Sequence, residues 1–136
     1  MARQALLMCF FLLAVAKFCS AQQMPGGIVE MTKDEIEKDD ILHAGVTFAV
    51  TEYNSKTNSR LIATEILQAT RQVVAGIKYV ALVELRPRLC VHDPKLKIAP
   101  CPPQLNLPTR CVFDILHQAW MPLKYTVLST KCFRAQ

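Results

Sequence analysis

The sequence lacks the clustered positive charge and the aromatic content that nucleic-acid-binding surfaces usually combine. Its 136 residues include 16 Lys and Arg, but these are spread along the chain, and only 7% of the residues are aromatic. Phosphate backbones are bound by grouped cations, and bases by stacked aromatic rings. A nucleic-acid partner therefore has little support, and a solvated, mildly basic surface is the better interpretation.

The sequence also lacks a recognisable set of catalytic groups. It has only four Gly residues and no glycine-rich phosphate-binding loop, and no pair of carboxylates stands in a known catalytic frame. The three histidines, His43, His92 and His117, fall in a predicted helix, a proline-rich loop and a predicted strand. A surface or packed role suits each of them better than a catalytic one. We therefore expect neither an enzyme nor a bound cofactor, and, without an Asn-x-Ser/Thr acceptor, no N-glycosylation.

Among the features that are present, a short apolar run marks the N-terminus. It extends from Ala5 to Ala16, follows Arg3 and precedes small residues that end at Ala21, which is typical of a secretory signal peptide. A membrane anchor is the competing interpretation, but a bilayer span needs roughly 20 apolar residues. The sequence thus predicts a signal peptide at 1–21, a secreted protein with no membrane anchor, and one mature domain at 22–136.

The cysteines indicate an oxidised chain. Two of the six lie in the predicted signal peptide, and the four that remain are Cys90, Cys101, Cys111 and Cys132. An even number in a secreted domain of this size predicts two disulfides. A zinc site is the alternative, but no Cys-x-x-Cys pair is present, so we expect no metal. Three pairings remain open, of which the sequential one closes the smallest loops.

A single helix is predicted early in the mature region, after an extended, mobile arm at 22–28. The stretch "EMTKDEIEKDD" marks its start, because carboxylates stabilise the positive end of the helix dipole, and it is expected to run through about Ser55. Apolar residues recur every three or four positions and form one broad face: Ile41, Leu42, Gly45, Val46, Phe48, Ala49 and Tyr53. Such a face must pack on another element.

That element is predicted to be an antiparallel sheet. One hairpin runs from Leu61 to Leu85, and its second arm alternates apolar and polar residues: Ile77, Tyr79, Ala81, Val83 and Leu85 share one face. The segment 86–110 holds six prolines and is expected to be a long loop. The stretches "CVFDILHQAW" and "LKYTVLSTKCF" predict a second hairpin. Together these elements predict an α+β fold, with one long helix packed on an antiparallel sheet.

Both hairpins turn at apolar residues, which is unusual. The first turns in "QVVAG", at Gln72, Val73, Val74, Ala75 and Gly76, and the second near Trp120. Turns normally use Gly, Pro, Asn, Asp or Ser. Exposed apolar side chains at such tips would mark a contact surface. The alternative is that the valines belong to a buried strand and that Trp120 lies in the core, and the spacing alone leaves both interpretations open.

Four features together resemble the secreted, two-disulfide (type 2) cystatin family. Gly26 and Gly27 precede the helix, the helix carries "FAVTEYN", "QVVAG" matches the family's Gln-x-Val-x-Gly motif, and the four cysteines follow in the same order. The resemblance covers essentially the whole mature region. It implies a helix held by a strongly curved sheet, and disulfides that join Cys90 to Cys101 and Cys111 to Cys132.

The resemblance also implies a function and a site. Such proteins reversibly inhibit papain-like cysteine proteases, the class that includes cathepsins L, S, B and H, by covering the active-site cleft. The implied contact residues are Gly26 and Gly27 of the arm, the Gln72–Gly76 tip, and Ala119 and Trp120 of the second loop. Ala119 stands where the family usually has proline, and the arm before Gly26 is short; both departures are expected to weaken or redirect inhibition.

Three further expectations concern legumain, the oligomeric state and a rival function. Some family members inhibit legumain through an Asn after the helix, and Asn58 in "KTNS" occupies that place, although a solvated turn asparagine is the favoured interpretation. The active form is expected to be a monomer, and the apolar tip raises the hypothesis of a domain-swapped dimer. The rival function is a cystatin-fold binding or host-defence module that does not inhibit proteases.

Overall fold

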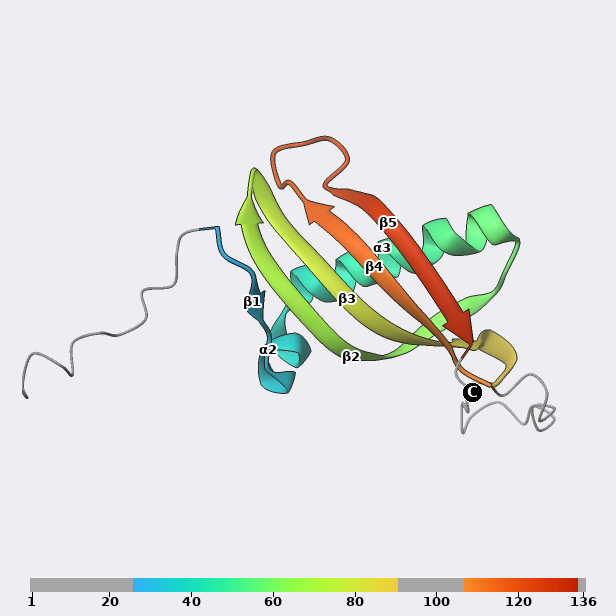
Figure 1. The fold of residues 1–136 in the computed structure, drawn as a ribbon. Coiled ribbons are helices and arrows are strands. Elements are labelled where there is room, and N and C mark those ends of the chain that lie inside the picture. The colour runs from blue at the N-terminus through green and yellow to red at the C-terminus, as the bar shows by residue number, and fades with distance from the viewer. Residues whose placement is uncertain (1–25, 91–106, 135–136) are drawn as a thin grey trace, which may run out of the picture.

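The structure is a computed structural model that describes residues 26–90 and 107–134. A five-stranded antiparallel sheet, with its strands in chain order, curves around one main helix (Figure 1). The elements are β1 (Val29–Glu30), α2 (Lys33–Lys38), α3 (Asp40–Thr57), β2 (Leu61–Val74), β3 (Gly76–Pro87), the 3-10 turn η2 (Arg88–Cys90), β4 (Thr109–His117) and β5 (Tyr125–Arg134). The predicted α+β fold is confirmed. The predicted signal peptide, the start of the arm, His92 and Cys101 lie outside the described residues.

The single early helix is divided in the structure. Asp39 adopts an extended backbone, ending α2 and capping the start of α3 through a 2.9 Å hydrogen bond from the Leu42 N–H to its carboxylate. α2 has its own start signal, a capping box in which the Thr32 and Glu35 side chains each accept a hydrogen bond from the other's backbone N–H. The acidic stretch therefore forms a separate short helix, and the main helix begins at Asp40.

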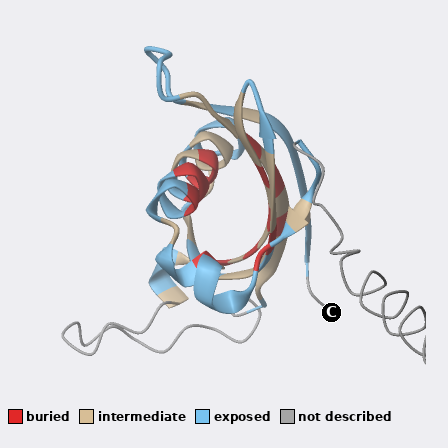
Figure 2. Ribbon diagram, turned by 90° about the vertical axis from the view of Figure 1, so that its left-hand side faces the viewer, coloured by how far each residue is buried: buried red, intermediate tan, exposed pale blue. Residues whose placement is uncertain are grey.

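The apolar face of α3 packs into the concave side of the sheet. Leu42, Val46 and Ala49 are buried as expected, and Val50, which the periodicity did not single out, is buried with them. Figure 2 shows the buried side of the helix and the buried inner face of the sheet opposite each other. Tyr53 is only partly buried, and Ile41 lies 37% exposed at the margin. The contact between α3 and the concave side of the sheet forms the core.

β3 follows the predicted alternation, and β4 shows the same pattern. In β3 every second residue from Tyr79 to Leu85 is buried, and in β4 the buried positions are Cys111, Phe113 and Ile115. β2 carries two register shifts against β3, between Ala63 and Glu65 and between Ile66 and Gln68. Such bulges bend a strand and increase its twist, so they let the long β2–β3 hairpin wrap around the helix.

One disulfide is fully described. Cys111 of β4 and Cys132 of β5 stand directly opposite each other in register and are joined, which is one of the two pairs that the resemblance implied. Cys90 in η2 is disulfide-bonded as well. Within the described ranges, none of the helices is both long enough and apolar enough to cross a bilayer.

Candidate functional site

The "QVVAG" segment forms the tip of the β2–β3 hairpin. Val74 pairs with Gly76, and Ala75 alone makes the turn between the two strands. The side chains of Val73 and Val74 are 63% and 43% exposed, so neither belongs to the core. The tip projects from one end of the curved sheet as an exposed segment (Figure 2).

Gly76 is the residue that makes this tight tip possible. Its φ of +117° lies where only glycine is comfortable, and a Cβ built on it would lie 2.3 Å from the backbone oxygen of His117. The end of β4 therefore passes directly against the tip. Any side chain at position 76 would push the two hairpins apart.

The second loop, between β4 and β5, lies beside this tip and is also apolar. A turn spans Gln118 to Met121, closed by a 3.1 Å hydrogen bond from the Met121 N–H to the Gln118 carbonyl. Trp120, in this turn, is 65% exposed. Met121 and Leu123 are 45% and 63% exposed and extend the apolar surface. These two residues were not predicted from the sequence, although apolar residues beside a turn tryptophan were a usable signal.

Two glutamine side chains join the three segments of this rim. Gln72 donates a hydrogen bond from Nε2 to the Gly26 carbonyl at 2.9 Å, which connects the β2–β3 tip to the arm. Gln118 donates from Nε2 to the Ala75 carbonyl at 2.8 Å, which connects the second loop to the same tip. We call the arm at Gly26–Ile28, the Gln72–Gly76 tip and the Gln118–Lys124 loop together the apolar rim.

The arm is held next to the tip by its backbone. Gly26 has φ +86°, and its Cβ position would lie 3.5 Å from the Val73 carbonyl oxygen. Beyond Gly27, Ile28 is 70% exposed, the highest value among the large hydrophobic residues of the apolar rim. β1 then pairs with β2 at Val29 and Glu30, which anchors the arm to the sheet. Ile28 was not among the residues selected from the sequence.

The apolar rim carries almost no charge. Within its three segments, Lys124 is the only ionisable side chain. The hydrogen-bonding groups of the apolar rim are partly paired through the side chains of Gln72 and Gln118. A partner that covers the rim therefore removes mainly apolar surface from water. Surfaces of this kind are suited to docking in a protein groove.

Asn58 lies elsewhere in the fold. It is exposed, forms the C-cap of α3 and takes a left-handed conformation with φ 51°, while its N–H bonds to the Asn54 carbonyl. Asparagine tolerates this conformation better than most residues, so the helix end accounts for its identity. The structure therefore places Asn58 in a turn at the start of β2, at the other end of that strand from the apolar rim (Figure 1).

The described histidines are not arranged for catalysis. His43 is exposed on α3, and the His117 ring packs 4.9 Å from the Tyr125 ring. In the part of the chain that the structure covers, no three His, Cys, Asp or Glu side chains lie close enough to hold a metal ion.

A helix held in a curved sheet, with three adjoining apolar segments at one end, defines a cystatin fold. A family model described as Cystatin domain matches residues 26–121. Cystatin J of Cyanea capillata is 65% identical over 112 residues, which cover 82% of this chain and 86% of the relative. Cystatin-C of Oryctolagus cuniculus is 30% identical over 128 residues, covering 90% of this chain and 82% of the relative. The chain belongs to the cystatin family, whose members are inhibitors of cysteine proteases and not enzymes.

Solved structures agree on the fold. The crystal structure of dimeric human cystatin F aligns with a TM-score of 0.62 at 20% identity, covering 87% of this chain and 94% of the other. The salivary cystatin from the soft tick Ornithodoros moubata aligns with a TM-score of 0.57 at 22% identity, covering 81% of this chain and 99% of the other.

Proposed function

We propose that this protein is a secreted, reversible, tight-binding inhibitor of papain-like cysteine proteases such as cathepsins, and that the apolar rim is the surface that enters the active-site cleft. The observation that carries the proposal is the joint exposure of Val73, Val74 and Trp120 on segments that hydrogen bonds hold together. Residues 22–136 form the inhibitory protein after removal of residues 1–21.

An estimate of the binding free energy indicates how much the loops and the arm of the apolar rim each contribute. Burying two valines and a tryptophan yields roughly 5 to 10 kcal/mol at about 25 cal/mol per Å². Association itself costs about 4 to 15 kcal/mol. The two loops alone therefore bind weakly to moderately, and tight inhibition requires the arm with Ile28 as well as the additional apolar surface of Met121 and Leu123.

The two loops of the inhibitor resist cleavage because they present no extended peptide to the catalytic cysteine. Two of the three segments are hairpin turns with fixed backbones: the Gln118 side chain donates a hydrogen bond to the Ala75 carbonyl, and the Met121 N–H closes the second turn on the Gln118 carbonyl. Such turns cover the cleft without placing a scissile bond in line with the nucleophile. Binding is then reversible and stoichiometric.

A titration tests the proposal. Active-site-titrated papain and cathepsin L are incubated with increasing amounts of the mature protein, and the residual activity is measured. The expected result is loss of activity that is complete near one equivalent. If an excess of the protein leaves both enzymes fully active, the rival function applies, a cystatin-fold binding or host-defence module.

We propose that the inhibitory form is the monomer. A domain-swapped dimer would have to straighten the β2–β3 tip and would lose the turn at Ala75, which is central to the apolar rim. Gel filtration with inhibition measured across the peaks tests this: inhibition is expected in the monomer peak, and an equally inhibitory dimer would contradict it.

Inhibition of legumain through Asn58 stays a prediction, and the left-handed helix cap explains this residue without it. Asn58→Gly is the appropriate variant, since glycine keeps the cap conformation and removes only the side chain. Legumain inhibition that is present in the parent protein and lost in this variant would establish the second site. Inhibition that persists would exclude Asn58.

A further inference from the structure

The end of the molecule opposite the apolar rim gathers arginines that are far apart in the sequence. Arg60 precedes β2, Arg88 follows β3, and Arg134 ends β5, and all three are exposed. The backbone N–H of Arg88 donates a 2.9 Å hydrogen bond to the Arg60 carbonyl, so these two residues are direct neighbours. In Figure 1 the start of β2, the end of β3, the turn η2 and the end of β5 lie together, away from the two loops of the rim.

These three arginines have no acidic partner in the described part of the chain. The ion pairs found there involve other cations, and none includes Arg60, Arg88 or Arg134. An unpaired guanidinium keeps all its donors available, and its planar fork matches the oxygens of an anion such as sulfate or carboxylate. Three such groups at one end of a small protein are therefore available to a polyanion.

These arginines line two adjoining grooves. The first has a volume of about 580 Å³, runs between α3 and the start of β2, and has Arg60 and Arg88 in its lining. The second, of about 280 Å³, has Arg134 in its lining and shares Ser59 and Leu61 with the first. The arginines thus border two neighbouring grooves that share part of their walls.

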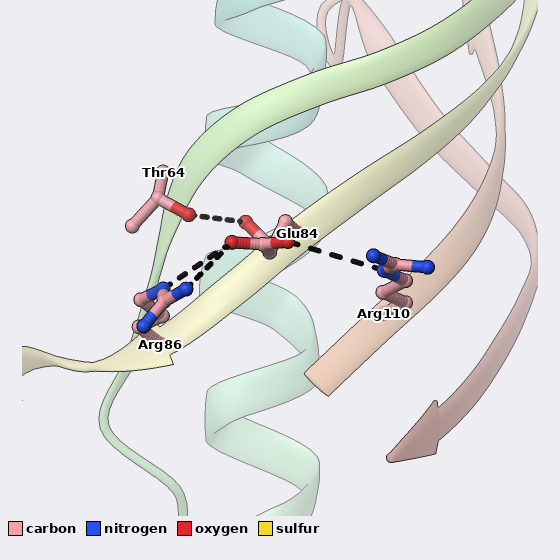
Figure 3. A network of polar contacts seen from close by, with 4 residues as sticks. All are labelled: Thr64, Glu84, Arg86 and Arg110. Atoms are coloured by element: carbon pink, nitrogen blue, oxygen red, sulfur yellow. Dashed lines mark hydrogen bonds and ion pairs between the residues drawn. The ribbon is translucent and has the colours of Figure 1, made fainter. Parts of the chain in front are cut away.

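A cluster of charged side chains lies on the sheet beside this end. Glu84 lies between Arg86 and Arg110 on the outer face of the sheet, with Nε of Arg86 at 3.2 Å and Nε of Arg110 at 3.9 Å from its carboxylate (Figure 3). One carboxylate therefore contacts two guanidinium groups. Nε of Arg110 is buried and has no hydrogen-bond partner.

Few further acidic groups of the described chain lie near this end. Glu52 is paired with Lys56 on α3, and Glu65 of β2 is exposed without a recorded ion pair. The acidic residues of the described chain are concentrated instead near α2: Glu30, Asp34, Glu35, Glu37, Asp39 and Asp40. The described part of the chain is therefore polarised. Its free arginines lie where β2 begins and where β3 and β5 end, a region that we call the arginine end.

We propose that the arginine end binds a linear sulfated polysaccharide, with Arg60 and Arg88 as one pair of sulfate contacts and Arg134 as a further contact in the adjoining groove. Sulfate groups repeat along such a chain and can meet successive guanidinium groups. Single-stranded nucleic acid fits less well, because its binding sites use several stacking rings. Here Phe133, beside Arg134, is the only exposed aromatic residue in the grooves' lining.

Because the arginine end and the apolar rim lie at opposite ends, the protein can hold the polysaccharide and a protease at once. The polysaccharide would fix the protein in a sulfated matrix while the apolar rim stays free. Binding of the sulfated chain rests only on the charges of the arginine end, so its outcome is independent of whether proteases are inhibited.

The test uses the full mature protein, a size-defined heparin octasaccharide as the probe, and two matched double variants. Arg60→Ser/Arg88→Ser removes two charges from the arginine end. Lys33→Ser/Lys38→Ser removes two exposed charges from α2 and serves as the control. Binding is measured by calorimetry between 0.05 and about 0.3 M NaCl, a range over which counterion release is resolved, and circular dichroism and thermal melts confirm that each variant folds.

The expected result is binding by the parent protein that weakens about tenfold in Arg60→Ser/Arg88→Ser, with the slope of log Kd against log salt reduced by about 1.5 to 2. The Lys33→Ser/Lys38→Ser control is expected to bind the octasaccharide as tightly as the parent protein does. If the parent inhibits papain, both variants are expected to inhibit it equally well. Absence of octasaccharide binding by the parent at 0.15 M NaCl, equal losses in the two variants, or tighter binding of a single-stranded oligonucleotide of equal charge would each overturn the proposal.

Discussion

The amide of Gln118 donates a 2.8 Å hydrogen bond to the backbone carbonyl of Ala75, and so joins the second loop to the tip of the first hairpin. The two apolar turns therefore behave as one surface rather than as two independent loops. Preorganisation of this kind reduces the entropy that is lost when a partner binds.

Gln118→Ala is predicted to weaken protease inhibition. Loss of one such hydrogen bond removes about 1 kcal/mol, which is a factor of about five in the inhibition constant. Inhibition constants against papain measure the effect, and Gln68→Ala, which changes an exposed glutamine in the middle of β2, is the control. An unchanged constant in Gln118→Ala would show that the two loops do not depend on each other.

Gln72→Ala is predicted to act only through the arm, because the Gln72 amide donates to the Gly26 carbonyl. The variant should weaken inhibition in the full mature chain and have no effect in a chain that begins at Ile28. The four proteins form a double-mutant cycle, and a coupling free energy of about 0.5 kcal/mol or more is expected. Additive losses would mean that Gln72 does not position the arm.

Val74→Asp is predicted to abolish tight inhibition while leaving the fold intact. Burying an unpaired carboxylate in an apolar cleft costs at least about 2 kcal/mol, or roughly 30-fold in the inhibition constant. Because Val74 is 43% exposed in the free protein, the melting temperature should hardly change. Ser129→Asp on β5 is the control. A large fall in melting temperature would identify Val74 as a core residue instead.

Ala119→Pro is predicted to strengthen inhibition. Ala119 is the second residue of the Gln118–Met121 turn, the position at which proline fits best. Its N–H makes no hydrogen bond within the described residues, so nothing is lost when the donor is removed. Restricting the free loop is worth about 0.4 to 1 kcal/mol, or two- to fivefold in the inhibition constant. Weaker inhibition would show that Trp120 needs a turn conformation that proline forbids.

Tyr79→Phe is predicted to change the alkaline stability of the protein. Tyr79 is buried and its hydroxyl donates to the Asp39 carboxylate at 3.0 Å. Burial, and next the hydrogen bond to Asp39, raise the pKa of the phenol above its ordinary value of 10.0. The unfolded chain therefore releases this proton first, and the free energy of unfolding falls as the pH rises above 10.

Urea unfolding at pH 7 to 11 measures this effect. The variant should lose about 1.5 to 3 kcal/mol at pH 7, because a hydrogen bond to a charged group is removed. It should also show a flatter decline above pH 10, because the titrating phenol is gone. Parallel pH profiles for parent and variant would contradict the assignment of the decline to Tyr79.

The parts of the fold that could be predicted from the sequence are those that local periodicity determines. The alternation from Ile77 to Leu85 and the helical spacing around Leu42 and Val46 report burial directly. The break at Asp39 could not be found in this way, because the acidic stretch is compatible with helix throughout. A contact with Tyr79, 40 residues away, accompanies the extended backbone there.

The candidate site also has some residues that could be predicted from the sequence and others that could not. The motif "QVVAG" and Trp120 were visible in the sequence because apolar residues at turns are unusual. The roles of Gln118 and Gly76 were not, since both depend on how closely the end of β4 approaches the first tip. The arginine end was missed for a related reason: Arg60, Arg88 and Arg134 are scattered along the chain, and only strand pairing brings their elements together.

The register of β2 limits how this protein can vary in length. Side chains alternate between the faces of a strand, so removing one residue between the second bulge and the tip would turn Gln72 to the opposite face and away from Gly26. The same deletion would place neighbouring residues, instead of Val73 and Val74, at the turn. Among natural variants, we therefore expect insertions and deletions to be excluded from residues 69–76, even where the individual side chains differ.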